Sequence, residues 1–138
     1  MRVFKNILLL LVMTISISSC NKLQDTTTTD VMHSMLVGKT WYLEYSISGS
    51  STKSYVGQIT YFITFYKDGT TVDSDGLTGN YTLNFVNGKY ELQVAAKSVN
   101  GNTLNYTHEI ESIGSVNMVQ SYVPNGQSSK ITQYYSNK

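Results

Sequence analysis

Polar and apolar residues alternate with a period of two along most of the chain beyond residue 40. Seven runs show this alternation, and the members that share one face in each run are Trp41, Leu43, Tyr45 and Ile47; Ile59, Tyr61, Ile63 and Phe65; Tyr81, Leu83 and Phe85; Tyr90, Leu92 and Val94; Leu104, Tyr106, His108 and Ile110; Val116, Met118 and Gln120; and Ile131, Gln133 and Tyr135. A period of two is typical of β-strands, in which successive side chains point to opposite faces. No segment resembles a helix long enough to connect parallel strands, so we expect the strands to be antiparallel.

Short turn sequences separate these runs. They are Asp68-Gly69, Asp75-Gly76, Asn87-Gly88, Asn100-Gly101 and Asn125-Gly126. Asn-Gly and Asp-Gly adopt positive φ angles at low cost, and type I′ hairpin turns require such angles. The sequence therefore predicts an all-β fold, an antiparallel up-and-down meander of about eight strands, closed as a barrel or folded as a sandwich. Closure as a barrel would remove the exposed strand edges.

The first twenty residues have the order of an export signal. Arg2 and Lys5 precede an apolar run, and small residues lead to Cys20, which is the single cysteine of the chain. Residues 17–20 resemble a bacterial lipobox, which implies cleavage of residues 1–19 as a lipoprotein signal peptide. The same resemblance implies lipidation of Cys20 by diacylglycerol and a further acyl chain such as palmitate. The alternative is an ordinary secretory signal with an incidental cysteine.

The lipobox also predicts where the protein resides. An aspartate after the lipidated cysteine holds many lipoproteins in the inner membrane, and this chain has Asn21 there. We therefore expect an outer-membrane protein of the cell envelope, attached to the membrane through lipid on Cys20. The sequence leaves open whether it faces the periplasm or the cell surface.

A polar stretch follows the cysteine, and we interpret residues 20–35 as the lipidated cysteine and a flexible tether. A short helical turn is expected over residues 31–37, and residues 36–138 form the predicted barrel domain. Residues 25–27 also resemble a short Bacteroidetes motif for glycan attachment, which would place a glycan on Thr26. A plain linker is the alternative.

Composition limits the partners of the chain. Removal of Arg2 and Lys5 with the signal leaves eight basic and nine acidic residues, so no basic patch predicts nucleic-acid binding. A lone cysteine cannot form an internal disulfide. The sequence identifies no protein partner and no oligomeric state.

Several motifs of the predicted strands resemble a known family. They are Gly38-x-x-Trp41, Phe65-x-x-Asp68-Gly69 and Gly79-x-Tyr81. Together they are similar to the lipocalin-like domain of small Bacteroidetes outer-membrane lipoproteins, although the first motif is one residue longer than in that family. The resemblance implies an up-and-down lipocalin-like barrel in which Trp41 packs in the core at one end. The resemblance implies no catalytic residue and no cofactor for this chain.

The residues that could carry catalysis or bind a metal are few. The two histidines, His33 and His108, lie far apart and form no zinc motif. Asp68, Asp73 and Asp75 superficially resemble a calcium loop, but the complete ligand pattern is missing, and we interpret them as turn residues. Glu109 and Glu111 are expected to face solvent rather than to act as an acid–base pair. We therefore predict that the chain is not an enzyme and needs no metal.

Six polar side chains fall on faces that should point into the barrel. They are Tyr61, Tyr106, His108, Gln120, Gln133 and Tyr135. Buried polar groups cost free energy unless they are hydrogen-bonded, and a mostly apolar cavity with a few polar groups is typical of a small-molecule site. We therefore predict that these residues bind a small apolar or amphipathic ligand. The alternatives are that they bond one another, or that one or two strands have the opposite orientation.

A second functional hypothesis needs no cavity. The loops of residues 48–55 and 122–129 are rich in Ser, Gly and Tyr, which suits adaptable protein contacts. The chain would then be an envelope interaction protein or an inhibitor that acts through these loops.

Overall fold

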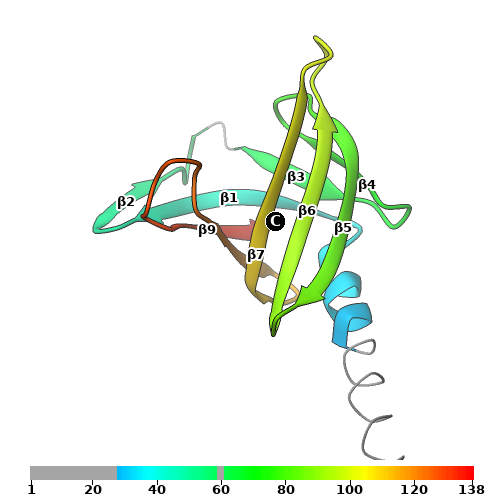
Figure 1. Cartoon of the computed structure of the whole chain (residues 1–138), viewed down its shortest axis with the longest axis horizontal. Coiled ribbons are helices and arrows are strands. Elements are labelled where there is room, and N and C mark those ends of the chain that lie inside the picture. The colour runs from blue at the N-terminus through cyan, green and yellow to red at the C-terminus, as the bar shows by residue number, and fades with distance from the viewer. Residues whose placement is uncertain (1–27, 59–60) are drawn as a thin grey trace, which may run out of the picture.

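The computed structural model describes residues 28–58 and 61–138, which form a short helix followed by a β-barrel (Figure 1). In the described residues the helix covers residues 28–36, which include most of the predicted helical turn. The strands are β1 (Lys39–Ser48), β2 (Ser51–Ser54), β3 (Phe62–Phe65), β4 (Thr70–Asp73), β5 (Thr78–Val86), β6 (Lys89–Lys97), β7 (Thr103–Ile113), β8 (Asn117–Tyr122) and β9 (Ile131–Asn137). Cys20, Asn21, Thr26 and Ile59 lie outside the described residues.

The strands pair with their neighbours in antiparallel fashion, and the pairing of β1 with β9 closes the barrel. The predicted all-β antiparallel barrel is confirmed. Nine segments make eight strands because β2 and β3 lie along the same edge of β1. The Leu43 N–H donates to the Tyr61 carbonyl at 2.9 Å, and the Tyr55 N–H donates to the Glu44 carbonyl at 2.8 Å. These bonds make β2 and β3 the two halves of one strand, interrupted between Tyr55 and Tyr61.

One part of the predicted alternation is wrong. Tyr45 and Ile47 were expected on the same face of β1 as Trp41, but the β1–β9 register shifts between Leu43 and Tyr45. Leu43 lies opposite Tyr135, whereas Tyr45 lies opposite Tyr134. A β-bulge of this kind inserts one residue, here Glu44, and so reverses the faces that follow it. Tyr45 therefore stacks on the ring of Tyr134, with 4.3 Å between ring centroids.

The helix packs against the core of the barrel. Trp41 is completely buried there, and its indole N–H donates to the Leu36 carbonyl at 2.9 Å. Leu36, Phe65 and Met118 are each about 1% exposed in the same core cluster. The prediction that Trp41 is a core residue is confirmed. The bond to Leu36 also satisfies a carbonyl in the last turn of the helix, where intrahelical partners run out.

A second bond fixes the helix to the barrel. The Tyr81 hydroxyl donates to the Tyr66 carbonyl at 2.8 Å, and the same oxygen lies 3.0 Å from Nε2 of His33. A hydroxyl carries one hydrogen, so His33 must be the donor in the second bond. His33 therefore has a structural position at the junction of the helix and the barrel.

Within the described residues, no helix has the length and apolar character that crossing a membrane requires.

Two glycine positions explain how the sequence bends the sheet. Asn87 and Gly88 both have positive φ angles, of 52° and 79°, as the predicted type I′ turn between β5 and β6 requires. Gly79 has an ordinary φ, but a Cβ there would lie 2.1 Å from the Ala95 carbonyl oxygen on β6. Only glycine permits this close approach of two strands.

Candidate functional site

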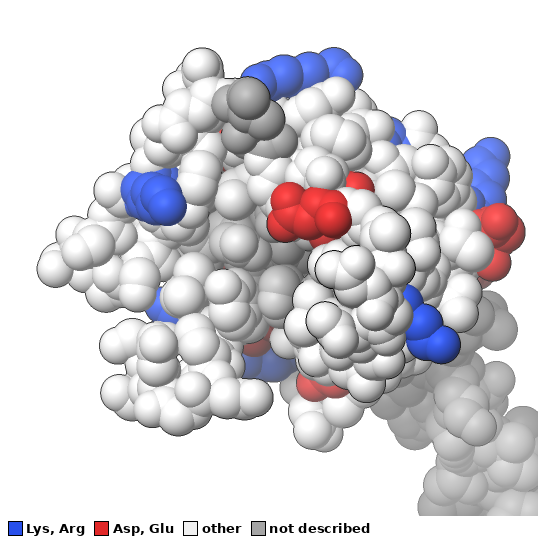
Figure 2. All heavy atoms as spheres, turned by 90° about the horizontal axis from the view of Figure 1, so that it is seen from above, with Lys and Arg blue, Asp and Glu red and all other residues white. Residues whose placement is uncertain are grey.

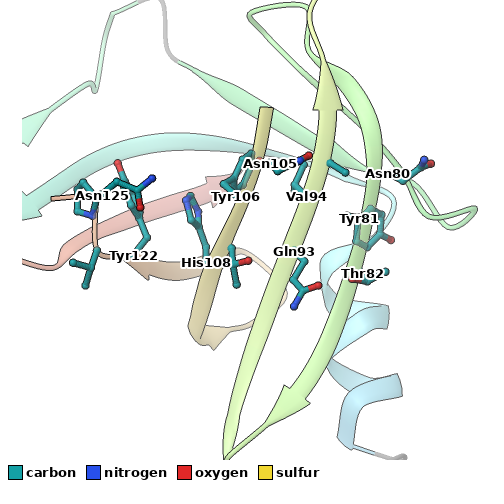
Figure 3. Close-up of a pocket in the computed structure, with 14 residues that line it drawn as sticks. Asn80, Tyr81, Thr82, Gln93, Val94, Asn105, Tyr106, His108, Tyr122 and Asn125 are labelled. Atoms are coloured by element: carbon teal, nitrogen blue, oxygen red, sulfur yellow. The ribbon is translucent and has the colours of Figure 1, made fainter. Parts of the chain in front are cut away.

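A pocket of about 780 Å³ lies along β5, β6 and β7 and reaches the loop that follows β8. Its volume is in the range typical of small-molecule sites. The lining residues shown in Figure 3 include Tyr81, Val94, Tyr106, His108, Tyr122 and Asn125. Figure 2 views the barrel from the end that carries the β6–β7 hairpin, opposite the helix, and shows a hollow bordered largely by uncharged residues.

The pocket is open because β7 and β8 pair over only part of their length. β7 pairs with β6 from Thr103 to Ile110, but its pairing with β8 begins at Glu109. Residues 103–108 therefore lack a neighbouring strand on one side. In the close-up, His108 and Tyr122 lie on that side of β7 (Figure 3). The closed barrel thus has an opening between the first half of β7 and the β8–β9 loop.

The lining carries no Lys, Arg, Asp or Glu side chain. Its aromatic rings belong to Tyr81, Tyr106, His108 and Tyr122, and Tyr hydroxyls and the Asn125 amide supply polar groups. Five further residues border the pocket from exposed positions that alternate with the interior residues of β5, β6 and β7: Asn80, Thr82, Gln93, Asn105 and Thr107. Aromatic faces offer apolar contact, whereas amides and hydroxyls can each donate and accept hydrogen bonds. This combination suits an uncharged ligand that has both apolar and polar parts.

His108 is the histidine of this pocket lining. Its ring stacks on Tyr122, with centroids 4.4 Å apart and planes 11° apart, and it contacts Tyr106 at 4.6 Å. Burial lowers the pKa of His108 to about 4, and the nearby Gln120 side chain offsets only part of this effect. The imidazole is therefore neutral at neutral pH. Its Nδ1 is buried and has no hydrogen-bond partner among the described residues.

Gln120, Gln133 and Tyr135 form a hydrogen-bonded polar cluster beside His108. The Gln120 amide nitrogen donates to the Tyr135 hydroxyl at 2.9 Å and to Gln133 Oε1 at 3.2 Å. The Tyr135 hydroxyl in turn donates to Gln133 Oε1 at 3.2 Å. These residues therefore bond one another, as one of the sequence alternatives proposed. Gln120 Oε1 is nevertheless buried without a partner among the described residues, as His108 Nδ1 is.

A third polar contact joins Tyr61 to β4. The Tyr61 hydroxyl donates to Oδ2 of Asp73 at 3.1 Å, and Asp73 is only 6% exposed. Burial, followed by the influence of the neighbouring Tyr106, raises the pKa of Tyr61. Burial likewise raises the pKa of Tyr106 to about 12, so both phenols are protonated at neutral pH. They can therefore act as hydrogen-bond donors.

The structure brings the six predicted residues to the barrel interior in three groups, one around His108, one around Gln120 and one around Tyr61. Tyr106 and His108 line the pocket itself. Tyr61, Gln120, Gln133 and Tyr135 lie in the polar contacts described above and are not part of the lining. Two of these four, Gln120 and Tyr135, are almost completely buried, at 4% and 3% exposed.

Sequence reasoning did not single out most of the lining. Asn80, Thr82, Gln93, Asn105 and Thr107 occupy exposed positions between the apolar members of each strand. Asn, Gln and Thr at such positions are typical of an ordinary solvated face, so the pattern contains no signal for them. Tyr122 and Asn125 could have been found, because they belong to the loop of residues 122–129 that the contact hypothesis included.

Four of the five acidic residues considered in the sequence have structural partners. Asp68 Oδ1 accepts from the N–H and the hydroxyl of Thr70, and Asp73 Oδ1 accepts from two N–H groups of the following turn. Glu109 pairs with Lys89 at 2.8 Å, and Glu111 pairs with Lys130 on the exposed surface. In the part of the chain that the structure describes, no group of three His, Cys, Asp or Glu side chains could hold a metal ion.

Comparison with protein-family models, with curated proteins and with solved structures yields no match to this chain. Its function must therefore be argued from the chemistry of the pocket.

Proposed function

We propose that this protein binds a small, uncharged, apolar or amphipathic molecule in the pocket of its lipocalin-like barrel, and that it acts by binding rather than by catalysis. The observation that carries the proposal is a pocket of about 780 Å³ lined by Tyr106, His108 and Tyr122 and by no charged residue. Beside it, Nδ1 of His108 is a buried polar atom that has no hydrogen-bond partner among the described residues. A buried polar atom without a partner costs roughly 1–3 kcal/mol. A ligand group that bonds this atom would recover that free energy.

The second unpartnered atom strengthens the proposal. Gln120 Oε1 can only accept a hydrogen bond, whereas neutral His108 can donate or accept at Nδ1 according to its tautomer. A hydroxyl group of a ligand could satisfy either atom. An ionised ligand fits poorly, because the lining offers no opposite charge to offset its desolvation.

The proposal places the protein in the outer membrane, held by lipid on Cys20. The support is the sequence: a positive N-terminus, an apolar run and a lone cysteine at the expected cleavage point. Each buried methylene contributes about 0.8 kcal/mol, so two or more acyl chains give lasting attachment. Mass spectrometry of the exported protein tests this part separately, since replacement of Cys20 by serine should abolish the added lipid mass.

The ligand prediction is tested with the full-length exported protein. Native mass spectrometry after incubation with a pool of neutral and charged envelope lipids and metabolites should recover neutral species only. His108→Phe keeps an aromatic ring against Tyr122 but removes both ring nitrogens, and it should weaken binding about tenfold, since a hydrogen bond of this kind contributes roughly 1.4 kcal/mol.

The control for this experiment lies on the same strand. Glu109 faces outward and pairs with Lys89, so Glu109→Gln should leave binding unchanged. Recovery of no ligand by the wild-type protein would contradict the proposed function. So would equal affinity of the His108→Phe variant.

A further inference from the structure

The open edge of β7 presents main-chain groups in a regular row. At the β6–β7 hairpin the Ser98 N–H donates to the Asn102 carbonyl at 2.9 Å. In an antiparallel ladder, residue pairs that exchange hydrogen bonds alternate with pairs that do not. Ser98 and Asn102 are therefore a hydrogen-bonded pair, and every second pair after them along the ladder is hydrogen-bonded as well. By this count, Leu104 bonds to Ala96 and Tyr106 bonds to Val94 on β6.

The residues between them therefore direct their main-chain groups away from β6. These residues are Thr103, Asn105 and Thr107, whose N–H and C=O groups point toward the open edge. β8 does not meet them, because its pairing with β7 starts at Glu109. Within residues 28–58 and 61–138, no loop main-chain hydrogen bond meets them either.

This edge also lacks the usual protection against strand pairing. Natural edge strands carry Lys, Pro, a bulge or a covering loop, because an unpaired edge is a template for another strand. Residues 103–108 contain neither a charged residue nor a proline, and their register with β6 is regular. Thr103, Asn105 and Thr107 are all exposed. The edge is therefore accessible and able to pair.

We propose that the open edge of β7 receives an extended, uncharged peptide segment of a partner protein, which adds to the barrel as a further antiparallel or parallel strand. This inference goes beyond the proposed function, because the binding groups are main-chain groups of β7 and the occupant is a peptide, although the peptide would share the pocket with the proposed small ligand. Main-chain hydrogen bonds would supply the affinity. Alternate side chains of the peptide would enter the pocket beside His108 and Tyr122, where no charged group lines the wall.

The pocket argues for a single strand rather than for a second copy of the barrel. The segment Tyr122–Asn125 lines the pocket together with the first half of β7. A single strand can enter between these two walls, whereas the edge of a second barrel would bring its own adjoining strands against the loop. The length of the unpaired row, from Thr103 to Thr107, matches a short peptide of five to seven residues.

The test uses the full-length protein and a seven-residue capped peptide of alternating threonine and valine, which has high β-propensity and no charge. Amide hydrogen exchange is followed by NMR with and without the peptide. The peptide should slow exchange at least tenfold at Thr103, Asn105 and Thr107. Leu104 and Tyr106 provide an internal control, because their N–H groups already bond to β6 and should change little.

Two variants at one position separate backbone from side-chain effects. Asn105→Pro removes an N–H that points to the open edge and leaves the β6–β7 ladder bonds in place, so it should weaken peptide binding about tenfold or more. Asn105→Ala keeps the N–H and should bind as the wild type does. If Asn105→Pro fails to fold, a peptide N-methylated at alternate residues should lose binding to the wild-type protein.

Three results would overturn the inference. The first is unchanged exchange at the three amides with millimolar peptide. The second is equal peptide binding by Asn105→Pro and Asn105→Ala, or by the N-methylated peptide. The third is protection that arises without peptide and grows with protein concentration, which would assign the edge to a second copy of the chain. His108→Phe tests the ring nitrogens proposed for small-ligand binding, whereas the N-methylated peptide tests only the main-chain bonds proposed for β7, so the two proposals can fail independently.

Discussion

Replacing Trp41 with alanine is expected to reduce the free energy of unfolding by about 4 kcal/mol. The indole is completely buried against Leu36, Phe65 and the rest of the core cluster, so its removal leaves a large cavity at the end of the barrel where the helix packs. It also removes the bond from the indole N–H to the Leu36 carbonyl. Urea denaturation followed by circular dichroism measures the loss.

A second substitution at this position separates the loss of packing from the loss of the hydrogen bond. Trp41→Phe keeps most of the ring volume but removes the N–H donor, which leaves the Leu36 carbonyl without its partner from the barrel. We expect Trp41→Phe to cost about 1–2 kcal/mol. A loss below about 1.5 kcal/mol for Trp41→Ala would show that the helix end of the barrel is not the main site of core packing.

Acidification is expected to destabilise the protein by about 3 kcal/mol between pH 6.5 and pH 4 through His108 alone. Burial lowers the pKa of this imidazole to about 4, whereas the unfolded chain has the ordinary value near 6.5. Between these two values the unfolded state binds a proton that the folded state does not. Stability is therefore complete above about pH 6.5 and falls as the pH decreases toward 4.

His108→Phe isolates this contribution, because phenylalanine does not titrate. The free energy of unfolding of this variant should be nearly constant over the same pH interval. Hydrogen bonds to Ser136 and Lys130 lower the pKa values of Glu44 and Glu111, so these groups begin to lose their stabilising effect as the pH falls toward their ordinary value of 4.5. The comparison of the variant with the wild type therefore removes their common contribution. Equal pH dependence of the wild type and the variant would contradict the buried, neutral state of His108.

Much of the fold could be predicted because local chemistry determines it. The positive φ angles of Asn87 and Gly88 make the tight turn that pairs β5 with β6. The alternation of apolar and polar residues on either side of the turn matches the alternating faces of the two strands. Trp41 could be assigned to the core from the resemblance of the Gly38-x-x-Trp41 motif, and its complete burial confirms that assignment. β2 and β4 escaped prediction, since Ser51–Ser54 and Thr70–Asp73 contain almost no apolar residues from which a period can be measured.

The candidate site was less predictable, since it depends on long-range geometry. The bulge at Glu44 has no local signature, yet it turns Tyr45 and Ile47 to the outside. His108 and Tyr122 meet only because β7 and β8 pair in one particular register. Asn105 and Thr107 line a pocket because β8 stops before it reaches them, and no property of those two residues reveals where a neighbouring strand ends.

The position of the helix has a consequence for how the barrel would stand on a membrane. The helix packs at one end of the barrel, and the β6–β7 hairpin lies at the opposite end (Figure 1). Seven residues, 21–27, separate Cys20 from residue 28, and even a fully extended chain over this distance reaches about 28 Å at most. With lipid on Cys20, the end of the barrel that packs against the helix would face the bilayer, and the end that carries the β6–β7 hairpin would point into the aqueous compartment. If the protein binds a ligand as proposed, that ligand would then enter from the aqueous side, at the end of the barrel farthest from the membrane.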